Sequence, residues 1–251
     1  MAFDYTNYTP VEYIQSNGTQ YIQSPITATD GIFDMDIKFN SVNTTSNRSI
    51  YFGCRVASGN IVDFLHTKSA SLGYGFKGAW KDGLFGYSAD TIYHITASLL
   101  INPQSASLNI DGDDYGITSG FSAVSSSSYT HDILAYNSIS SGGGHQIPAI
   151  GASLYSLKWF NASGTLLYNF VPCITKDPTP VAGLYETINE VFYGNDGTGI
   201  FAYGSPIVTG SNVWLKDSGT WKQADTVYIK DAGVWKAATN VYIKDSGSWK
   251  S

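Results

Sequence analysis

The chain has 251 residues, of which 43% are apolar and only 14% are charged, and its formal net charge is −6. This length fits one large or two smaller domains with a full core, and the negative charge argues against nucleic acid as a partner of the whole chain. Glycine and tyrosine are abundant, with 26 and 18 residues. Such a composition favours strands and tight turns and predicts an all-β protein.

The sequence shows neither a membrane segment nor a secretion signal. No apolar run approaches the roughly 20 residues that a spanning helix needs, and the first residues lack the basic and apolar parts of a signal peptide. We therefore expect the chain to be made in a cytoplasm, without a membrane partner. Cys54 and Cys173 are then expected to be reduced and buried, with a disulfide between them as the alternative.

Residues 1–10 are expected to form a polar arm, and from Val11 onward apolar and polar residues alternate as in strands. Asn17-Gly18 between two apolar runs predicts a hairpin. Further hairpin turns are predicted at Asp82-Gly83, Asp111-Gly112 and Asn195-Asp196-Gly197. The other predicted strands cover residues 31–39, 49–56, 62–66, 73–80, 84–88, 91–101, 106–110, 133–136, 152–160, 165–170 and 190–193. Many short strands without a helical period predict a two-sheet antiparallel sandwich over residues 11–207.

Residues 208–251 contain a unit that occurs three times at a spacing of 14 residues, starting at Val213, Val227 and Val241. Repetition at a fixed period marks an array of small units, which present surfaces more often than they perform chemistry. Each unit predicts a hairpin with a turn at Asp-Ser-Gly or Asp-Ala-Gly. Aliphatic residues are expected on one face of each hairpin and aromatic residues with lysine on the other, and this segment is basic within an acidic chain.

Such short hairpins bury too little surface to be stable alone. We expect the repeats either to pack on the sandwich or to self-associate, with a trimer favoured. The residues expected to mediate oligomerisation or attachment are Trp214, Trp221, Tyr228, Trp235, Tyr242 and Trp249. A second interpretation is an aromatic cage for a cation or a sugar, with the three repeated tryptophans as its walls.

Two parts of the chain resemble a known family. The segment 11–22, Val-Glu-Tyr-Ile-Gln-Ser-Asn-Gly-Thr-Gln-Tyr-Ile, resembles the opening of laminin-G-like (concanavalin A-like) domains in proteins of bacteriophages and gut bacteria. Segments 154–160, 169–173, 181–185 and 191–201 resemble the closing block of these domains, in the same order and spacing. The resemblance covers about residues 11–204 and implies a jelly-roll sandwich, a fold that hosts lectins, adhesins, glycosidases and structural modules. The repeats resemble tryptophan-lysine hairpins appended to phage structural proteins.

Catalytic patterns are missing from the sequence. Glycosidases that share the resemblance carry Glu-x-Asp-x-x-Glu on one strand, and this chain has no such cluster. Glu186 and Glu190 are four residues apart, but residues 184–192 are expected to form a strand, a turn and a strand. The four histidines lack metal-ligand spacing, and no nucleophile elbow or phosphate loop occurs. We therefore expect a protein that is not an enzyme.

The candidate binding residues are aromatic and acidic. Tyr74 and Trp80, on the same face of one predicted strand, and Tyr87 are candidates for stacking on a sugar, with core packing as the alternative for this strand. The metal candidates are Asp111, Asp113 and Asp114, which could hold calcium or simply form the Asp-Gly turn. No cofactor is expected beyond this calcium.

These features together favour a non-enzymatic accessory protein of a phage virion, such as a head fibre, decoration or tail-appendage subunit, assembled in the host cytoplasm. Its expected partners are further copies of itself, other virion proteins and host surface glycans. The alternative is a dedicated carbohydrate-binding module or a bacterial surface adhesin.

Overall fold

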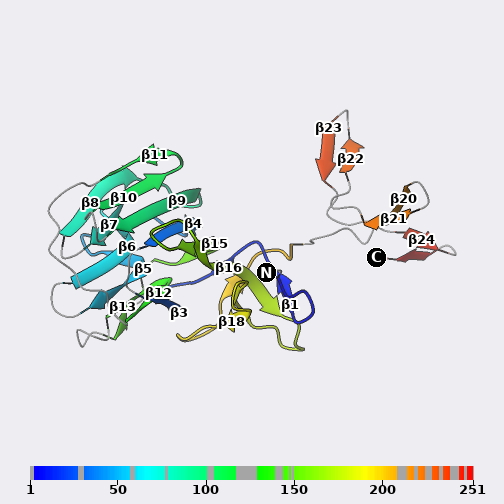
Figure 1. Ribbon diagram of the computed structural model, residues 1–251, viewed down its shortest axis with the longest axis horizontal. Helices are drawn as coiled ribbons and strands as arrows, with labels where there is room; N and C mark the ends of the chain where they lie inside the picture. Colours follow the sequence, from blue (N-terminus) through cyan, green and yellow to red (C-terminus); the bar gives the residue numbers. More distant parts are fainter. Residues whose placement is uncertain are drawn as a thin grey trace. The chain divides into compact units, whose positions relative to one another are not determined.

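The computed structural model describes residues 3–27, 31–56, 60–76, 79–100, 105–116, 129–138, 144–146, 148 and 150–207, followed by 214–217, 220–223, 228–231, 234–237, 243–245 and 248–250. The chain divides into two compact units, residues 1–205 and 206–251, and the first unit is the large body of strands in Figure 1. The described residues form strands, turns and loops, and no helix able to cross a membrane is found among them.

The strands of the first unit are β1 (Tyr8–Pro10), β2 (Ile14–Gln15), β3 (Ile22–Thr27), β4 (Gly31–Phe39), β5 (Ser49–Val56), β6 (Asn60–Lys68), β7 (Ser71–Phe76), β8 (Ala79–Gly86), β9 (Ile92–Leu100), β10 (Ser105–Ile110), β11 (Asp113–Asp114), β12 (Thr130–Ile133), β13 (Ala135–Asn137), β14 (His145–Gln146), β15 (Ala152–Phe160), β16 (Leu166–Thr175), β17 (Ala182–Glu186), β18 (Val191–Tyr193) and β19 (Ala202–Tyr203).

These strands form two sheets. Within the described residues, one sheet follows the order β11-β10-β9-β4-β15-β16-β17-β18, with β1, β2 and β19 paired beside this path. The other follows β14-β13-β5-β6-β7-β8, with β12 and β3 beside it. Neighbouring strands are antiparallel, apart from the parallel pair of β5 and β13. The all-β prediction and the two packed sheets are therefore confirmed (Figure 1).

The core lies between the two sheets and follows the alternation of the sequence. In β4, Phe33 and Met35 are buried while Asp34 and Asp36 are half-buried on the opposite face. This period of two is what a sheet with one covered face requires. Trp159, expected in the core, is 2% exposed and packs edge-on against Phe52 of the other sheet at 6.1 Å between ring centroids.

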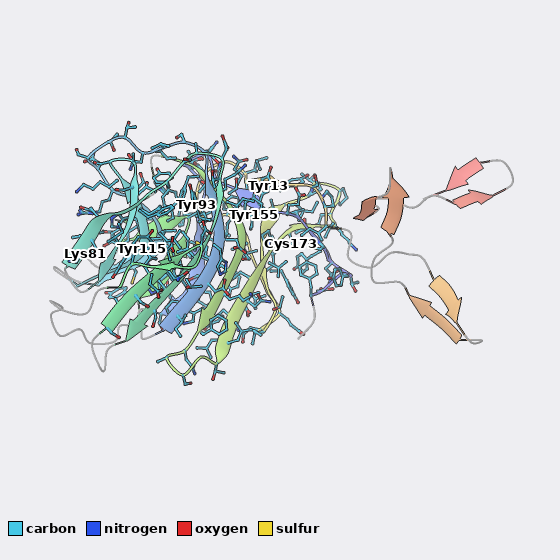
Figure 2. All side chains as sticks on the ribbon, turned by 90° about the horizontal axis from the view of Figure 1, so that it is seen from above. Tyr13, Lys81, Tyr93, Tyr115, Tyr155 and Cys173 are labelled. Atoms are coloured by element: carbon cyan, nitrogen blue, oxygen red, sulfur yellow. The ribbon has the colours of Figure 1, made fainter. Side chains whose placement is uncertain are left out.

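Aromatic rings fill one end of this core. Phe85 packs edge-on against Tyr93 at 5.6 Å and against Tyr115 at 5.9 Å. Tyr93 and Tyr115 are labelled in Figure 2, which shows their side chains among the first unit's strands. Edge-to-face pairs of this kind add to the stabilisation that buried aromatic area provides.

Both cysteines are free thiols in the interior, as predicted. Cys54 and Cys173 are buried and unbridged, so the alternative of a disulfide between them is wrong. Burial raises the pKa of each thiol to about 12 because the thiolate would lose its hydration. Both therefore behave as small apolar residues of the core.

The hairpin predicted at Asn17-Gly18 does not form. Gly18 adopts a positive φ of 97°, so a tight bend is present. However, β2 pairs with β15 and β19, whereas β3 pairs with β12 in the other sheet. The backbone N–H of Asn17 donates to Oε1 of Gln20 at 2.9 Å, and the Ser16 hydroxyl donates to the carbonyl of Gln20 at 3.0 Å. These bonds stabilise a loop that carries the chain between the two sheets.

Asp82-Gly83 is also not a hairpin turn, because it lies inside β8. The pairing of β7 with β8 shifts between Leu72 and Tyr74, and Gly83 has a positive φ of 73° at this irregularity. Glycine with positive φ is a common component of a β-bulge. The predicted single strand 73–80 is therefore wrong as well, since β7 ends at Phe76 and β8 begins at Ala79.

The remaining two turn predictions have opposite outcomes. Asp111-Gly112 does close a hairpin, because Ile110 pairs with Asp113 and both turn residues have positive φ. Asn195-Asp196-Gly197 does not join paired strands. Instead, its side chains accept hydrogen bonds from backbone N–H groups at the start of β3, at 3.1 and 2.7 Å.

The polar arm expected over residues 1–10 is partly a strand. β1 pairs with β16, with Tyr8 opposite Thr175. The Tyr8 ring stacks on Phe192 at 5.2 Å and tilts against Tyr185 at 5.0 Å. The last part of this segment therefore belongs to the eleven-stranded sheet, and its aromatic residues cover the face of β17 and β18.

The second unit contains three short strand pairs: β20 (Trp214–Asp217) with β21 (Thr220–Gln223), β22 (Tyr228–Asp231) with β23 (Val234–Ala237), and β24 (Ile243–Asp245) with β25 (Ser248–Lys250). Each is antiparallel, and in the described part of the chain these strands pair only within their own hairpin.

Candidate functional site

Trp80, the leading candidate for sugar contact, lies on the outer face of the eight-stranded sheet. It pairs with Gly75, so the adjacent Tyr74 belongs to the opposite face. Trp80 is half-buried and packs with Ile50 and Tyr136 in a cluster separate from the main core. The guanidinium of Arg48 lies over the indole, 4.1 Å from its centroid. One face of the ring is therefore already occupied by a cation.

Asp82, two residues along β8, holds the cations of this cluster in place. Arg48 donates to both carboxylate oxygens of Asp82 at 2.8 and 2.7 Å, and Lys68 donates to Oδ2 at 2.7 Å. Nε2 of His66 lies 2.9 Å from Oδ1. Burial alone would raise the pKa of Asp82, but hydrogen bonds from Arg48 and Lys68 and the charge of Arg48 outweigh it and lower the pKa.

A glycine makes room for this arrangement. A Cβ built on Gly73 would overlap the carbonyl oxygen of Lys81 and lie 2.7 Å from Nε2 of His66. The imidazole of His66 is fully buried and meets Trp80 edge-on at 5.4 Å. The cluster is thus a preorganised, net cationic patch with one partly covered aromatic ring.

Tyr74 and Tyr87, the other sugar candidates, are core residues. They are 2% and 5% exposed, and both belong to the main apolar cluster. The Tyr87 hydroxyl accepts a hydrogen bond from the backbone N–H of Asn43 at 2.6 Å. The structure therefore does not bring these two rings to the surface beside Trp80.

The metal candidates lie at the β10–β11 turn, where their carboxylates bind the protein itself. Asp111 accepts from the backbone N–H of His94 at 2.9 Å, and Asp114 accepts from the side chain of Asn109 at 2.8 Å. Asp113 is exposed beside them. Among the residues that the structure describes, no group of three or more acidic, histidine or cysteine side chains is suited to hold a metal ion.

The segment that holds the two glutamates singled out in the sequence forms a strand, a turn and a strand, as expected. Glu186 ends β17 with a fully buried side chain, whereas Glu190 is exposed. Oε1 of Glu186 accepts from the N–H groups of Asn169 and Ile188, both at 2.9 Å. Its Oε2 accepts from the backbone and the side chain of Asn189 at 2.7 and 2.8 Å. This carboxylate organises the turn that follows it.

A second buried carboxylate was not singled out in the sequence. Asp132 on β12 is fully buried, and its Oδ2 lies 2.6 Å from Nδ1 of His145. The ring of Tyr21 stacks on this imidazole at 4.7 Å. Burial is the dominant effect on Asp132 and raises its pKa to about 6, although the hydrogen bond to His145 acts in the opposite direction. No local sequence pattern links these residues.

The other histidines are also placed by the fold. His131 lies in the core, where burial lowers its pKa to about 3 and keeps the ring neutral. His94 is on the outer face of the eleven-stranded sheet, with Nδ1 2.8 Å from Asp36. The hydroxyl of Ser156 donates to the other oxygen of Asp36 at 2.7 Å.

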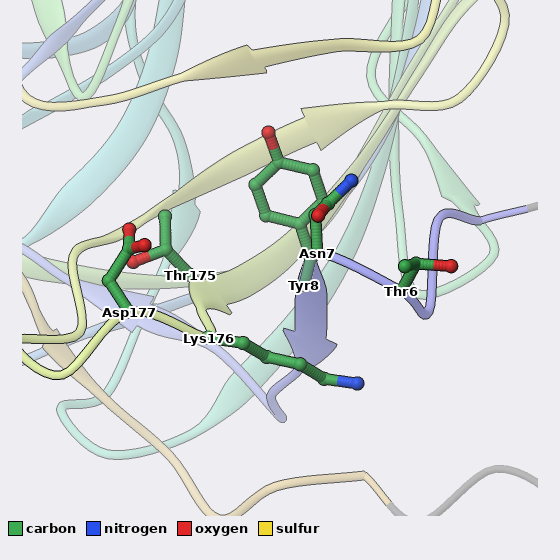
Figure 3. A pocket seen from close by; sticks show the side chains of 6 residues that line it. All are labelled: Thr6, Asn7, Tyr8, Thr175, Lys176 and Asp177. Atoms are coloured by element: carbon green, nitrogen blue, oxygen red, sulfur yellow. The ribbon is translucent and has the colours of Figure 1, made fainter.

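A polar depression of about 440 Å³ lies between β1 and the end of β16 (Figure 3). It is lined by Thr6, Asn7, Tyr8, Thr175, Lys176 and Asp177. All six residues are exposed or half-buried. The ammonium group of Lys176 donates to the carbonyl of Tyr5, and its backbone N–H donates to the carbonyl of Asn7 at 3.0 Å. These contacts fasten the amino-terminal segment to the sheet.

The aromatic residues of the repeats are placed by backbone register. Trp214, Trp221, Tyr228, Trp235 and Trp249 lie on described strands, whereas Tyr242 falls outside the described residues. The side chains of the three hairpins are likewise not described. Whether these aromatic residues mediate assembly remains a prediction.

No protein-family description matches the chain, and no curated protein matches it in sequence. The geometry of the chain itself therefore carries the functional argument.

Proposed function

We propose that the chain is a non-enzymatic accessory subunit of a bacteriophage virion, such as a head fibre, decoration or tail-appendage subunit. In this proposal a jelly-roll, laminin-G-like sandwich is displayed, and the repeats assemble the chain into an oligomer or attach it to another virion protein. The observation that carries the proposal is that the same hairpin occurs three times in the chain, each time with the same pairing register.

The hairpin registers support an assembly role. Leu215, Ile229 and Ile243 occupy equivalent positions, each opposite a lysine. An isolated two-stranded hairpin is at best marginally stable in water. Three such hairpins in series therefore need a covering surface, and a closed oligomer supplies one by bringing equivalent aliphatic faces together. A trimer is the assembly that we favour.

The sandwich supports a display role. Residues 1–205 form a compact unit of their own, with an extensive core and charged side chains on the outer faces. Such a unit folds without depending on the repeats and can present a surface. Weak adhesion to host glycans would use the Trp80 cluster, whose cations would meet an acidic or hydroxyl-rich ligand.

Light scattering on the intact chain and on a truncation that ends at Gly210 tests the assembly role. We expect the intact protein to have about three times the 27.1 kDa mass of one chain, and the truncation to be monomeric. An intact protein that is monomeric would overturn this part of the proposal.

The virion assignment needs a separate measurement. The chain should be found by mass spectrometry in purified particles of the virus that encodes it, at a constant ratio to the major capsid protein. Particles that lack it would leave the alternative, a carbohydrate-binding module or adhesin. In that case, glycan-array binding by the truncation that is lost in Trp80→Ala would support the alternative.

A further inference from the structure

The three hairpins place a lysine directly opposite a tryptophan at the same register position each time. Lys216 pairs with Trp221, Lys230 with Trp235 and Lys244 with Trp249. The lysines of these pairs are called the Trp-paired lysines below. In each hairpin the Lys–Trp pair is the second pair from the turn. The first pair contains Asp217, Asp231 or Asp245.

The same registers put the other three lysines opposite aliphatic residues. Lys222 pairs with Leu215, Lys236 with Ile229 and Lys250 with Ile243. These are called the aliphatic-paired lysines. Because neighbouring positions along a strand alternate between faces, the two sets of lysines belong to opposite faces of each hairpin. The six lysines of the second unit thus fall into two register classes.

A second aromatic residue shares the face of each Trp-paired lysine in the first two hairpins. Trp214 precedes Lys216 by two residues, and Tyr228 precedes Lys230 by two residues. Residues two apart along a strand share a face, and diagonal neighbours across a strand pair are within reach of aromatic side chains. One face of each of these hairpins therefore combines two aromatic residues with one cation.

An acidic sugar can contact both the aromatic residues and the lysine on such a face. The apolar C–H face of a pyranose ring packs on an aromatic ring, and its carboxylate is attracted to an ammonium group. A neutral sugar would use only the ring, and a simple anion would use only the lysine. The basic character of this segment in a chain of net charge −6 also favours an anionic ligand.

We propose that the Lys–Trp faces of the three hairpins bind an acidic polysaccharide, with one acidic sugar for each hairpin. The proposal rests on the surface-displayed subunit described above and names the ligand class of its repeats. The aliphatic faces remain available for assembly, because they lie on the other side of each hairpin.

Three sites that share a Lys–Trp pair in one chain make weak contacts effective. Once one hairpin holds a polymer, the next acidic sugar is presented to the neighbouring hairpin at high local concentration. Each exposed ammonium–carboxylate contact changes binding by up to about fivefold. Loss of all three Trp-paired lysines should then weaken binding of a polymer by about 100-fold.

Biolayer interferometry on the full chain tests the proposal, with immobilised polygalacturonate and polysialic acid as probes. Fully methyl-esterified polygalacturonate is the matched neutral ligand. We expect the intact protein to bind at least one of the acidic polymers and to bind the ester at least about tenfold more weakly. Absence of binding to both acidic polymers, or equal binding to the ester, would overturn the proposal.

The two register classes provide a matched pair of variants. One variant changes the three Trp-paired lysines to glutamine, and the other changes the three aliphatic-paired lysines, so that both lose the same charge. Only the first should lose about 100-fold in affinity, and arginine at the Trp-paired positions should restore binding. Equal losses in both variants would show diffuse charge attraction and reject the proposal.

Light scattering on the same samples separates this inference from the proposed assembly. An oligomer that does not bind acidic polymers contradicts only the ligand, whereas a monomer that binds them contradicts only the assembly. Equally tight binding to double-stranded DNA would also reject the ligand class, because it would require no sugar contact.

Discussion

The buried carboxylate of Glu186 gives the sharpest test of how the sandwich is built. The substitution Glu186→Gln keeps the size and shape of the side chain but replaces one acceptor oxygen with an amide group that can only donate. If the retained oxygen keeps the bonds from Asn169 and Ile188, the amide faces the two N–H donors of Asn189. Donors would then face donors inside the turn.

The cost follows from the hydrogen bonds that are lost. A hydrogen bond to a charged acceptor contributes about 2 kcal/mol, and both bonds from Asn189, at 2.7 and 2.8 Å, lose their acceptor. The free energy of unfolding should therefore fall by about 4 kcal/mol. The bonds retained through the other oxygen also weaken, because the acceptor is no longer charged.

Urea denaturation followed by tryptophan fluorescence measures this change at neutral pH. Glu190→Gln is the matched control, since Glu190 is exposed in the same turn region, and its effect should stay within about 0.5 kcal/mol. If Glu186→Gln were as stable as the control, the carboxylate would not organise the turn. A hydrolytic activity lost in a folded Glu186→Gln variant would instead revive a catalytic role for this residue.

Two further perturbations test the core and the second buried acid. Gly31→Ala would place a Cβ against the indole of Trp159 and should lower the free energy of unfolding by about 3 kcal/mol in the same assay. Gly86→Ala is the control, because its Cβ meets open space, and it should change this free energy by less than about 1 kcal/mol. Equal losses in both variants would refute the packing argument. Burial raises the pKa of Asp132 to about 6, so its folded form binds a proton more tightly than the unfolded form, and its contribution to stability falls as pH rises from about 4 to about 6. Asp132→Asn should remove up to about 3 kcal/mol of this pH dependence, whereas parallel stability curves for both proteins would contradict the assignment.

The strands were predictable because the alternation of apolar and polar residues along a strand indicates which of its faces is buried. The boundaries of β4, β5 and β15 agree with the expectation from apolar and polar periodicity. Turn signals were less informative about pairing. Gly18 and Gly83 do adopt positive φ, but one bends a loop between the sheets and the other lies in a bulge. A glycine in a turn pattern predicts the local backbone conformation but does not predict which strands pair with each other.

The candidate site was only partly predictable for the same reason. Trp80 was singled out, yet Arg48, which covers its ring, is 32 residues away in sequence. Tyr74 was expected on the face of Trp80, an error that follows from treating residues 73–80 as one strand. Gly78 was the signal that could have indicated a break. Asp132 and His145 come together through strand pairing, and no periodicity predicts such a contact.

The two proposals for the repeats are compatible because of their register. Assembly requires a surface that is costly to expose, and the face of Leu215, Ile229 and Ile243, which also carries the aliphatic-paired lysines, supplies one. Recognition of an acidic polymer requires cations beside aromatic rings, and the Trp-paired lysines and their tryptophans occupy the other face. A trimer that buried its aliphatic faces would present nine Lys–Trp pairs on one particle, three for each chain. Assembly would then strengthen binding through multivalency, so the affinity of the intact protein for an acidic polymer should fall on dilution below its assembly concentration.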